Sequence, residues 1–161
     1  MLNKPFTKEQ AIQKIKHYCS YQERSHYEVK EKLFSYGLFK KSVEEIIALL
    51  IEEDYLNEER FAKCYVSGKY KMNHWGRIKI EQGLKQRQVS TYNIRIAMKQ
   101  IDEESYHQTL HKLAQQKWDR LKGEQYIRRQ AKTIDYLLQK GFEPSVVYSA
   151  VKALQEEGKK R

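Results

Sequence analysis

The chain has 161 residues, a formal net charge of +10 and 40% apolar residues. This composition can bury only a modest core, so it favours small packed modules over one large globule. No apolar stretch is long enough to cross a bilayer, and the N-terminus MLNKPFTKEQ lacks the apolar core of a signal peptide, so we expect a soluble, cytoplasmic protein. Cys19 and Cys64 have no metal-ligand spacing, and we expect two free thiols.

Helix-start signals recur in chain order. Three segments have the S/T-x-x-E/Q form of a capping box, and they begin at Thr7, Ser25 and Ser42. Further N-caps are expected at Asn57, Asn73, Thr91 and Asp102. Between these marks the apolar residues recur every three or four positions, and no segment alternates as a strand would. The pattern predicts nine amphipathic helices of about 10–18 residues and an all-α fold.

Three residues are placed to begin or end helices. Pro144 is expected to be a first helical residue, because its missing amide hydrogen costs nothing there. Gly37 and Gly141 are expected to end helices in a left-handed conformation.

The apolar positions repeat about every 50 residues. A shift of 51 residues aligns seven apolar positions, from Val29 on Ile80 to Leu50 on Ile101, and a further shift of 53 aligns six. A repeat of this length is typical of modular helical arrays. We therefore predict three tandem three-helix modules in an elongated, curved array, with boundaries at 1–54, 55–102 and 103–161. The alternative is a single helical bundle whose helices merely share a period.

The positive charge lies mainly in the middle of the chain. Residues 1–54 are neutral, residues 55–102 carry a net charge of +6, and residues 103–161 carry +4. Such a basic block favours contact with phosphates or an acidic protein surface over an ordinary solvated surface, which mixes signs. The predicted contact residues are Lys69, Lys71, Arg77, Lys79, Lys85, Arg87, Arg95 and Lys99.

Four aromatic residues are interleaved with this block: Tyr65, Tyr70, Trp75 and Tyr92. They are able to stack on unpaired bases. Large aromatics also dominate small cores, so the alternative for each of them, taken singly, is a core or helix-packing residue.

The sequence has no catalytic constellation. It lacks a glycine-rich phosphate loop and a G-x-S-x-G motif. His107 and His111 share a helix-face spacing but have no evident third ligand, so we interpret them as surface residues. We predict a binding protein that is not an enzyme and needs no metal or cofactor.

Three segments carry recognisable motifs: residues 22–33, ending near Gly37-Leu38, residues 54–62, and residues 75–84. The first resembles the first-module signature of the bacterial RecX regulators, the second resembles that family's link into its second module, and the third resembles its central basic helix. The resemblance runs from about Ala11 to Leu154, and residues 139–142 carry it in the third module. One departure is Gln88, where the family often has glycine, so Gln88 must adopt a left-handed conformation or the helix must end differently.

The resemblance implies a modulator, usually an inhibitor, of the RecA recombinase that lies in or caps the groove of the RecA–DNA filament. It also implies some affinity for single- or double-stranded DNA, and a role in DNA recombination, repair and the SOS response. We expect a monomer with no membrane partner. Two rivals stay open. A helix-turn-helix-type DNA-binding regulator predicts a preferred DNA site, and a helical-repeat scaffold for protein interactions predicts negligible DNA binding at low salt.

Overall fold

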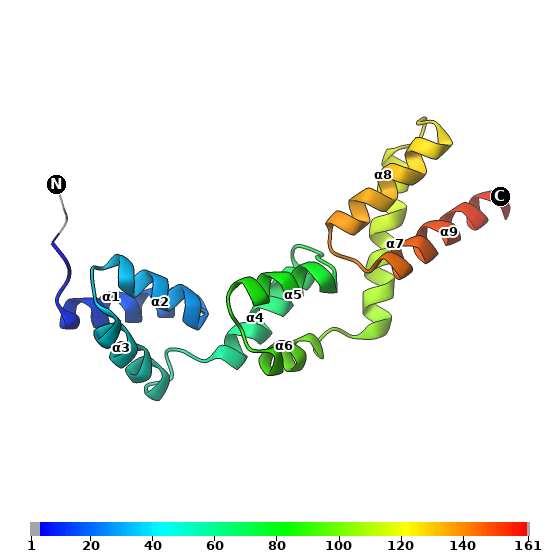
Figure 1. The fold of residues 1–161 in the computed structure, drawn as a ribbon. Helices are drawn as coiled ribbons and strands as arrows, with labels where there is room; N and C mark the ends of the chain where they lie inside the picture. The colour runs from blue at the N-terminus through cyan, green and yellow to red at the C-terminus, as the bar shows by residue number, and fades with distance from the viewer. Residues whose placement is uncertain (1–3, 161) are drawn as a thin grey trace. The chain divides into compact units, whose positions relative to one another are not determined.

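The computed structural model describes residues 4–160, with the side chains of residues 4–158. Within that range the chain forms nine helices and no strand (Figure 1). The helices are α1 (Lys8–Tyr21), α2 (His26–Ser35), α3 (Lys40–Glu52), α4 (Glu58–Lys71), α5 (Arg77–Gln86), α6 (Thr91–Met98), α7 (Glu103–Arg120), α8 (Tyr126–Gln139) and α9 (Pro144–Lys160). The predicted all-α fold of tandem three-helix modules is confirmed.

The described residues pack into two compact units. One contains the chain up to Tyr65 together with Gly83–Ala97, and the other contains Val66–Gln82 together with the chain from Met98 onward. Helices α4 and α5 therefore contribute residues to both. The predicted module boundaries, and the elongated, curved arrangement, stay predictions.

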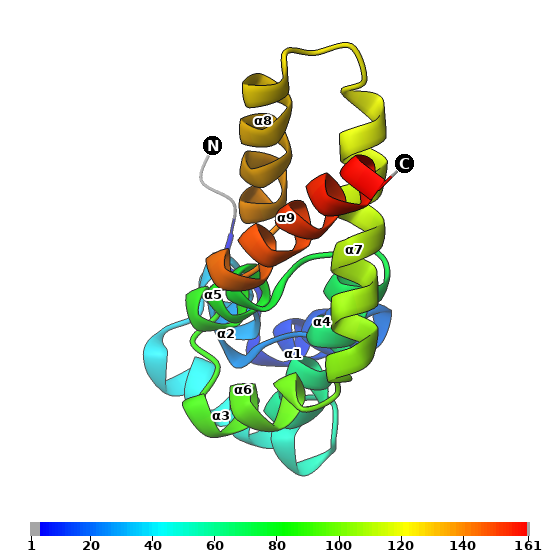
Figure 2. The ribbon, with the colours of Figure 1, turned by 90° about the vertical axis from the view of Figure 1, so that its right-hand side faces the viewer.

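Each unit has its own set of packed helices. In the first unit, helices α1, α2 and α3 pack against one another around a core that includes Ala11, Ile15, Val29, Leu33 and Leu50. In the second unit, α8 lies beside α7, and α9 packs against both (Figure 2).

The predicted repeat is visible in what is buried. Leu33, Leu84 and Leu137 are aligned with one another by the shifts of 51 and 53 residues, and each is 0% exposed. Val43, Ile94 and Val147 form a second buried set of equivalent positions. The same apolar positions thus face the core in each of the three repeats, because each repeat places its helices in the same order and phase.

Several helix starts lie where the sequence predicts them. The Thr7 hydroxyl accepts the Gln10 amide at 3.2 Å, and the Gln10 side chain accepts the Thr7 amide at 3.0 Å, which completes the capping box. The side-chain oxygens of Ser25, Asn57 and Asp102 each accept a hydrogen bond from the backbone amide three residues later in the chain. Pro144 is the first residue of α9.

Three predicted caps are wrong. Helix α3 begins at Lys40, and the Phe39 carbonyl accepts the Val43 amide, so Ser42 lies inside the first turn. Asn73 lies in a turn ahead of α5. Thr91 is the first residue of α6, and the preceding Ser90 hydroxyl accepts the Asn93 amide instead.

The second helix of each repeat ends on a left-handed residue at the equivalent position. Gly37 has φ 88°, Gly141 has φ 99°, and between them in the repeat Gln88 has φ 58°. At this exit from α5 the Val89 amide donates to the Leu84 carbonyl at 3.1 Å. Of the two possibilities for Gln88, the structure therefore has the left-handed one, in which a side chain with a Cβ is strained.

This strain predicts that Gln88→Gly stabilises the protein. Removing the Cβ should raise the free energy of unfolding by about 1 kcal/mol, because glycine adopts a positive φ without steric cost. Urea denaturation followed by circular dichroism measures the change. The matched control is Gln86→Gly in the last turn of α5, which should lower stability by up to about 1 kcal/mol. Equal effects of the two substitutions would contradict this account of the α5 exit.

Candidate nucleic-acid interface

Trp75 lies between two lysines. The Lys69 ammonium, in the last turn of α4, is 4.7 Å from the centre of the Trp75 ring, and the Lys79 ammonium, in the first turns of α5, is 4.5 Å from it. The intervening turn brings the indole back to α4: His74 has φ 55°, and the Trp75 amide donates to the Lys69 carbonyl at 3.0 Å. Trp75 is half-buried. The turn thus holds one aromatic face between two positive charges.

A third lysine lies beside this pair. The Lys140 ammonium donates to the Asn73 carbonyl at 2.7 Å, and the Lys79 ammonium lies 3.5 Å from the Gln139 carbonyl. Burial and the nearby charge of Lys79 together lower the pKa of Lys140 from its ordinary value. We call Lys69, Trp75, Lys79 and Lys140 the Trp75 cluster. A bound anion would offset the repulsion between Lys79 and Lys140, which makes the cluster suited to phosphates.

A contact between two backbones positions the cluster. The Gly76 amide donates to the Lys140 carbonyl at 2.7 Å, and the Ile78 amide donates to the Gly141 carbonyl at 3.0 Å. A Cβ on Gly76 would lie 2.3 Å from the Gly141 carbonyl carbon. The start of α5 can therefore approach the turn between α8 and α9 this closely only because residue 76 has no side chain.

We predict that Gly76→Ala destabilises the protein by about 2 kcal/mol, because the added methyl group meets backbone that cannot move aside. Thermal and urea unfolding measure the loss. Gly68→Ala is the matched control: position 68 lies inside α4 with nothing within 4 Å of an added Cβ, so alanine there should raise stability by up to about 1 kcal/mol. Gly76→Ala with unchanged stability would contradict the close backbone contact.

Arg77 is held within the fold. Its guanidinium pairs with Glu103 of α7 and, at 3.2 Å, with Glu143 just ahead of α9, and lies 4.0 Å from the centre of the Tyr106 ring. The buried Tyr106 hydroxyl accepts the Arg77 amide and donates to Glu143. Burial and the Glu143 bond raise the pKa of Tyr106. Arg77 thus joins α5 to α7 and to the residue just ahead of α9, and its guanidinium is already engaged by carboxylates.

Arg87 has a similar place in the first unit. Its Nε donates to Glu28 at 2.9 Å, and its Nη1 donates to the Gly83 carbonyl at 3.0 Å. The guanidinium lies 5.0 Å from the Tyr65 ring centre. Tyr65 packs directly over Gly83, where a Cβ would clash with its hydroxyl at 1.9 Å. Arg87 and Tyr65 are therefore packing residues in this unit.

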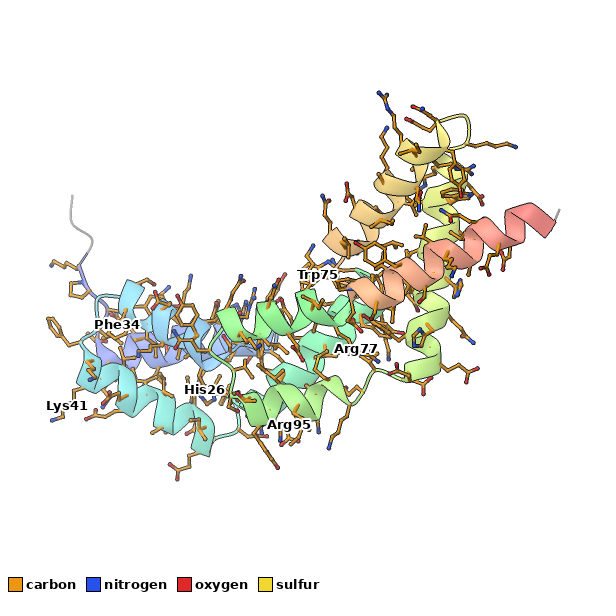
Figure 3. All side chains as sticks on the ribbon, turned by 45° about the vertical axis from the view of Figure 1, so that its right-hand side comes forward. His26, Phe34, Lys41, Trp75, Arg77 and Arg95 are labelled. Atoms are coloured by element: carbon orange, nitrogen blue, oxygen red, sulfur yellow. The ribbon has the colours of Figure 1, made fainter. Side chains whose placement is uncertain are left out.

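The other four predicted contact residues are exposed. Lys71 ends α4, Lys85 lies in the last turn of α5, Arg95 projects from α6 (Figure 3), and Lys99 follows α6. The eight predicted residues divide between the two compact units, with Lys85, Arg87 and Arg95 in the first. That all eight form one binding surface stays a prediction.

Of the four interleaved aromatics, two pack inside the fold. Tyr70 is 9% exposed, and its hydroxyl lies 2.9 Å from that of Ser105. Tyr65 packs over Gly83, whereas Tyr92 is 67% exposed. Packing thus accounts for Tyr65 and Tyr70, and Trp75 and Tyr92 keep surface able to meet a base.

The described chain offers little for metal chemistry. Within residues 4–160 no group of three or more His, Cys, Asp or Glu side chains is arranged to hold a metal ion. The His107 Nε2 lies 3.2 Å from the Glu103 carboxylate one turn earlier in α7. Cys19 and Cys64 are free thiols, as predicted. No helix among the described residues is both long and apolar enough to span a membrane.

Family models for two RecX domains match this chain. The model of the second three-helix domain matches residues 57–98, and that of the third matches residues 103–151. The regulatory protein RecX of Bacillus cytotoxicus is 26% identical over 140 residues, which are 87% of this chain and 52% of that protein. The one from Clostridium perfringens strain 13 is 30% identical over 129 residues, which are 79% and 60% of the two chains. The chain spans about half the length of the first curated relatives that it matches.

Solved structures agree with the fold. RecX from Lactobacillus salivarius superposes with a TM-score of 0.80 at 24% identity, over 92% of this chain and 96% of that one. A second regulatory protein RecX superposes with a TM-score of 0.81 at 27% identity, over 91% and 73% of the two chains. The fold and these matches define a class of regulatory proteins built from repeated three-helix domains. Within that class, the chain belongs to the RecX family.

Proposed function

We propose that this protein binds the RecA recombinase and the RecA–DNA filament, inhibits RecA-driven recombination and ATP hydrolysis, and has DNA affinity of its own. Membership of a regulatory family supports the first part. The Trp75 cluster is the observation that carries the second, because two lysines lie over one half-buried indole and a third lysine, Lys140, lies beside Lys79. We further propose that the protein acts as a monomer in the cytoplasm, without a cofactor.

Phosphate contact is the mechanism that fits these residues. Lysine is a mobile point charge, and each phosphate that it neutralises releases condensed counterions. The exposed Lys71, Lys85, Arg95 and Lys99 extend the same role. Arg77 and Arg87 enter the proposal differently from the others, as residues that hold helices in place, because their guanidiniums are paired with carboxylates.

The direct test is ATP hydrolysis by RecA on single-stranded DNA, with and without this protein. We expect hydrolysis to fall as the protein is added. Unchanged hydrolysis at equimolar and higher protein would overturn the RecA proposal. Negligible DNA binding at low salt would instead favour a protein-interaction scaffold, and a strong preference for one duplex sequence would favour a helix-turn-helix-type regulator.

The role of the Trp75 cluster predicts a change in salt dependence. Lys79→Gln with Lys140→Gln should weaken DNA binding and lower the slope of log affinity against log salt by about 1.4 on single strands, since two phosphate contacts are lost. Fluorescence anisotropy at several salt concentrations measures the slope, and circular dichroism checks that the variant is folded.

Lys112→Gln with Lys152→Gln is the matched control. Both lysines are exposed, lie in the same unit and are outside the Trp75 cluster, and the charge removed is the same. If the control and the cluster variant give the same slope, the cluster is not a phosphate site.

A further inference from the structure

A second basic and aromatic site lies in the first three helices. A hollow of about 580 Å³ is open between the segment ahead of α1, helix α1 and helix α2. This is within the range of roughly 300–1,000 Å³ typical of ligand pockets. Its rings and cations include Phe6, Lys14, Tyr18, Tyr21, Arg24 and Lys32, and none of its lining residues is acidic. We call it the first-module hollow.

The walls of the hollow are held in place. The Arg24 Nε donates to the Tyr18 carbonyl at 3.0 Å, and its guanidinium lies 3.7 Å from the centre of the Tyr18 ring. On the opposite wall, the Phe6 amide donates to the Tyr36 carbonyl at 3.0 Å, and the two rings meet edge to face with centres 5.2 Å apart. The rings therefore keep their positions without a ligand, which reduces the entropy lost on binding.

The cations of the hollow face rings and not carboxylates. The Lys14 ammonium lies 4.8 Å from the Phe6 ring centre, and the Lys32 ammonium lies 5.4 Å from that of Tyr18. In the described chain no carboxylate forms an ion pair with Lys14, Arg24 or Lys32. An anion entering the hollow would therefore meet cations that form no ion pair with any described carboxylate.

Three acids of the first unit form ion pairs with cations outside the hollow. Glu23 pairs with Arg60 at 2.6 Å, Glu28 pairs with Arg87 at 2.9 Å, and Glu53 pairs with Lys16 at 2.6 Å. Residues 1–54 are neutral in total, but these pairs leave the charges unevenly spread. The zero net charge therefore conceals a locally basic hollow.

Tyr21 indicates what the anion carries. It ends α1 at one side of the hollow and is 80% exposed, and the Arg24 guanidinium is 6.0 Å from its ring centre. A large ring kept in solvent beside several cations is the arrangement by which proteins stack unpaired bases while holding the backbone phosphates. A duplex does not offer its base faces in this way. We infer that the first-module hollow binds a segment of single-stranded DNA, with a base on Tyr21 and phosphates near Lys14, Arg24 and Lys32.

This inference does not depend on the Trp75 cluster or on RecA. The experiment uses the whole chain and a photoreactive oligothymidylate carrying bromouracil, with crosslinked peptides identified by mass spectrometry. We expect crosslinks within residues 6–36. Crosslinks confined to residues outside that range would overturn the inference, whatever the RecA assay shows.

Affinity measurements separate stacking from charge. Tyr21→Ala should weaken binding of the unmodified oligothymidylate about fivefold or more, whereas Tyr148→Ala, which removes a ring 54% exposed on α9, should leave it unchanged. Lys14→Glu with Lys32→Glu should lower the salt slope by at least about 1.4, and the charge-matched Lys30→Glu with Lys41→Glu should not.

Two further probes complete the test. An abasic oligonucleotide of equal length should bind the wild-type protein more weakly than oligothymidylate does. The abasic oligonucleotide should have about the same affinity for the Tyr21→Ala variant as for the wild-type protein. Polyglutamate should not displace the oligothymidylate at equal charge. Abasic DNA that binds as tightly as oligothymidylate, or polyglutamate that competes as well, would overturn base stacking and assign the hollow to acidic ligands in general.

Discussion

The contact between Gly76 and Gly141 is the constraint on which the central site depends. Two backbones meet there because residue 76 has no Cβ, and the Gly76 and Ile78 amides bond across the contact. The contact fixes the start of α5 against the turn that follows α8, and so it brings Lys79 next to Lys140. Without it, the start of α5 would not be fixed against the turn after α8, and Lys79 and Lys140 would not be held next to each other. A stability determinant and a candidate binding site are therefore the same local structure.

Two arginines of the basic region, Arg77 and Arg87, have a different role from its lysines and from the exposed Arg95. Arg77 and Arg87 each pair with carboxylates and lie over a tyrosine ring, a use that suits a planar, delocalised cation with fixed donor directions. Lys69 and Lys79 lie over the Trp75 ring with Lys140 beside Lys79, and Lys71, Lys85 and Lys99 are exposed. The number of basic residues therefore overstates how many groups can contact phosphates, because Arg77 and Arg87 are paired with carboxylates inside the fold.

The helices, their order and the three-fold repeat could be predicted from the sequence, because amphipathic periodicity is local and the repeat shows it three times. The left-handed conformation of Gln88 could be predicted in the same way, because the repeat aligns Gln88 with Gly37 and Gly141. The partners of Arg77 could not be predicted, since Glu143 is 66 residues away and periodicity carries no information about such pairs. Lys140 was missed for the same reason, although its place before Gly141 is a usable signal. The first-module hollow was hidden by a balanced net charge.

Lysine acetylation footprinting of the wild-type protein, with and without the RecA–DNA filament, tests the central claim most directly. The extent of modification at each lysine is read by mass spectrometry. Our account predicts that Lys69, Lys79 and Lys140 become protected several-fold in the complex, while Lys112 and Lys152 react as before. Complex formation with unchanged reactivity at Lys69, Lys79 and Lys140 would contradict it.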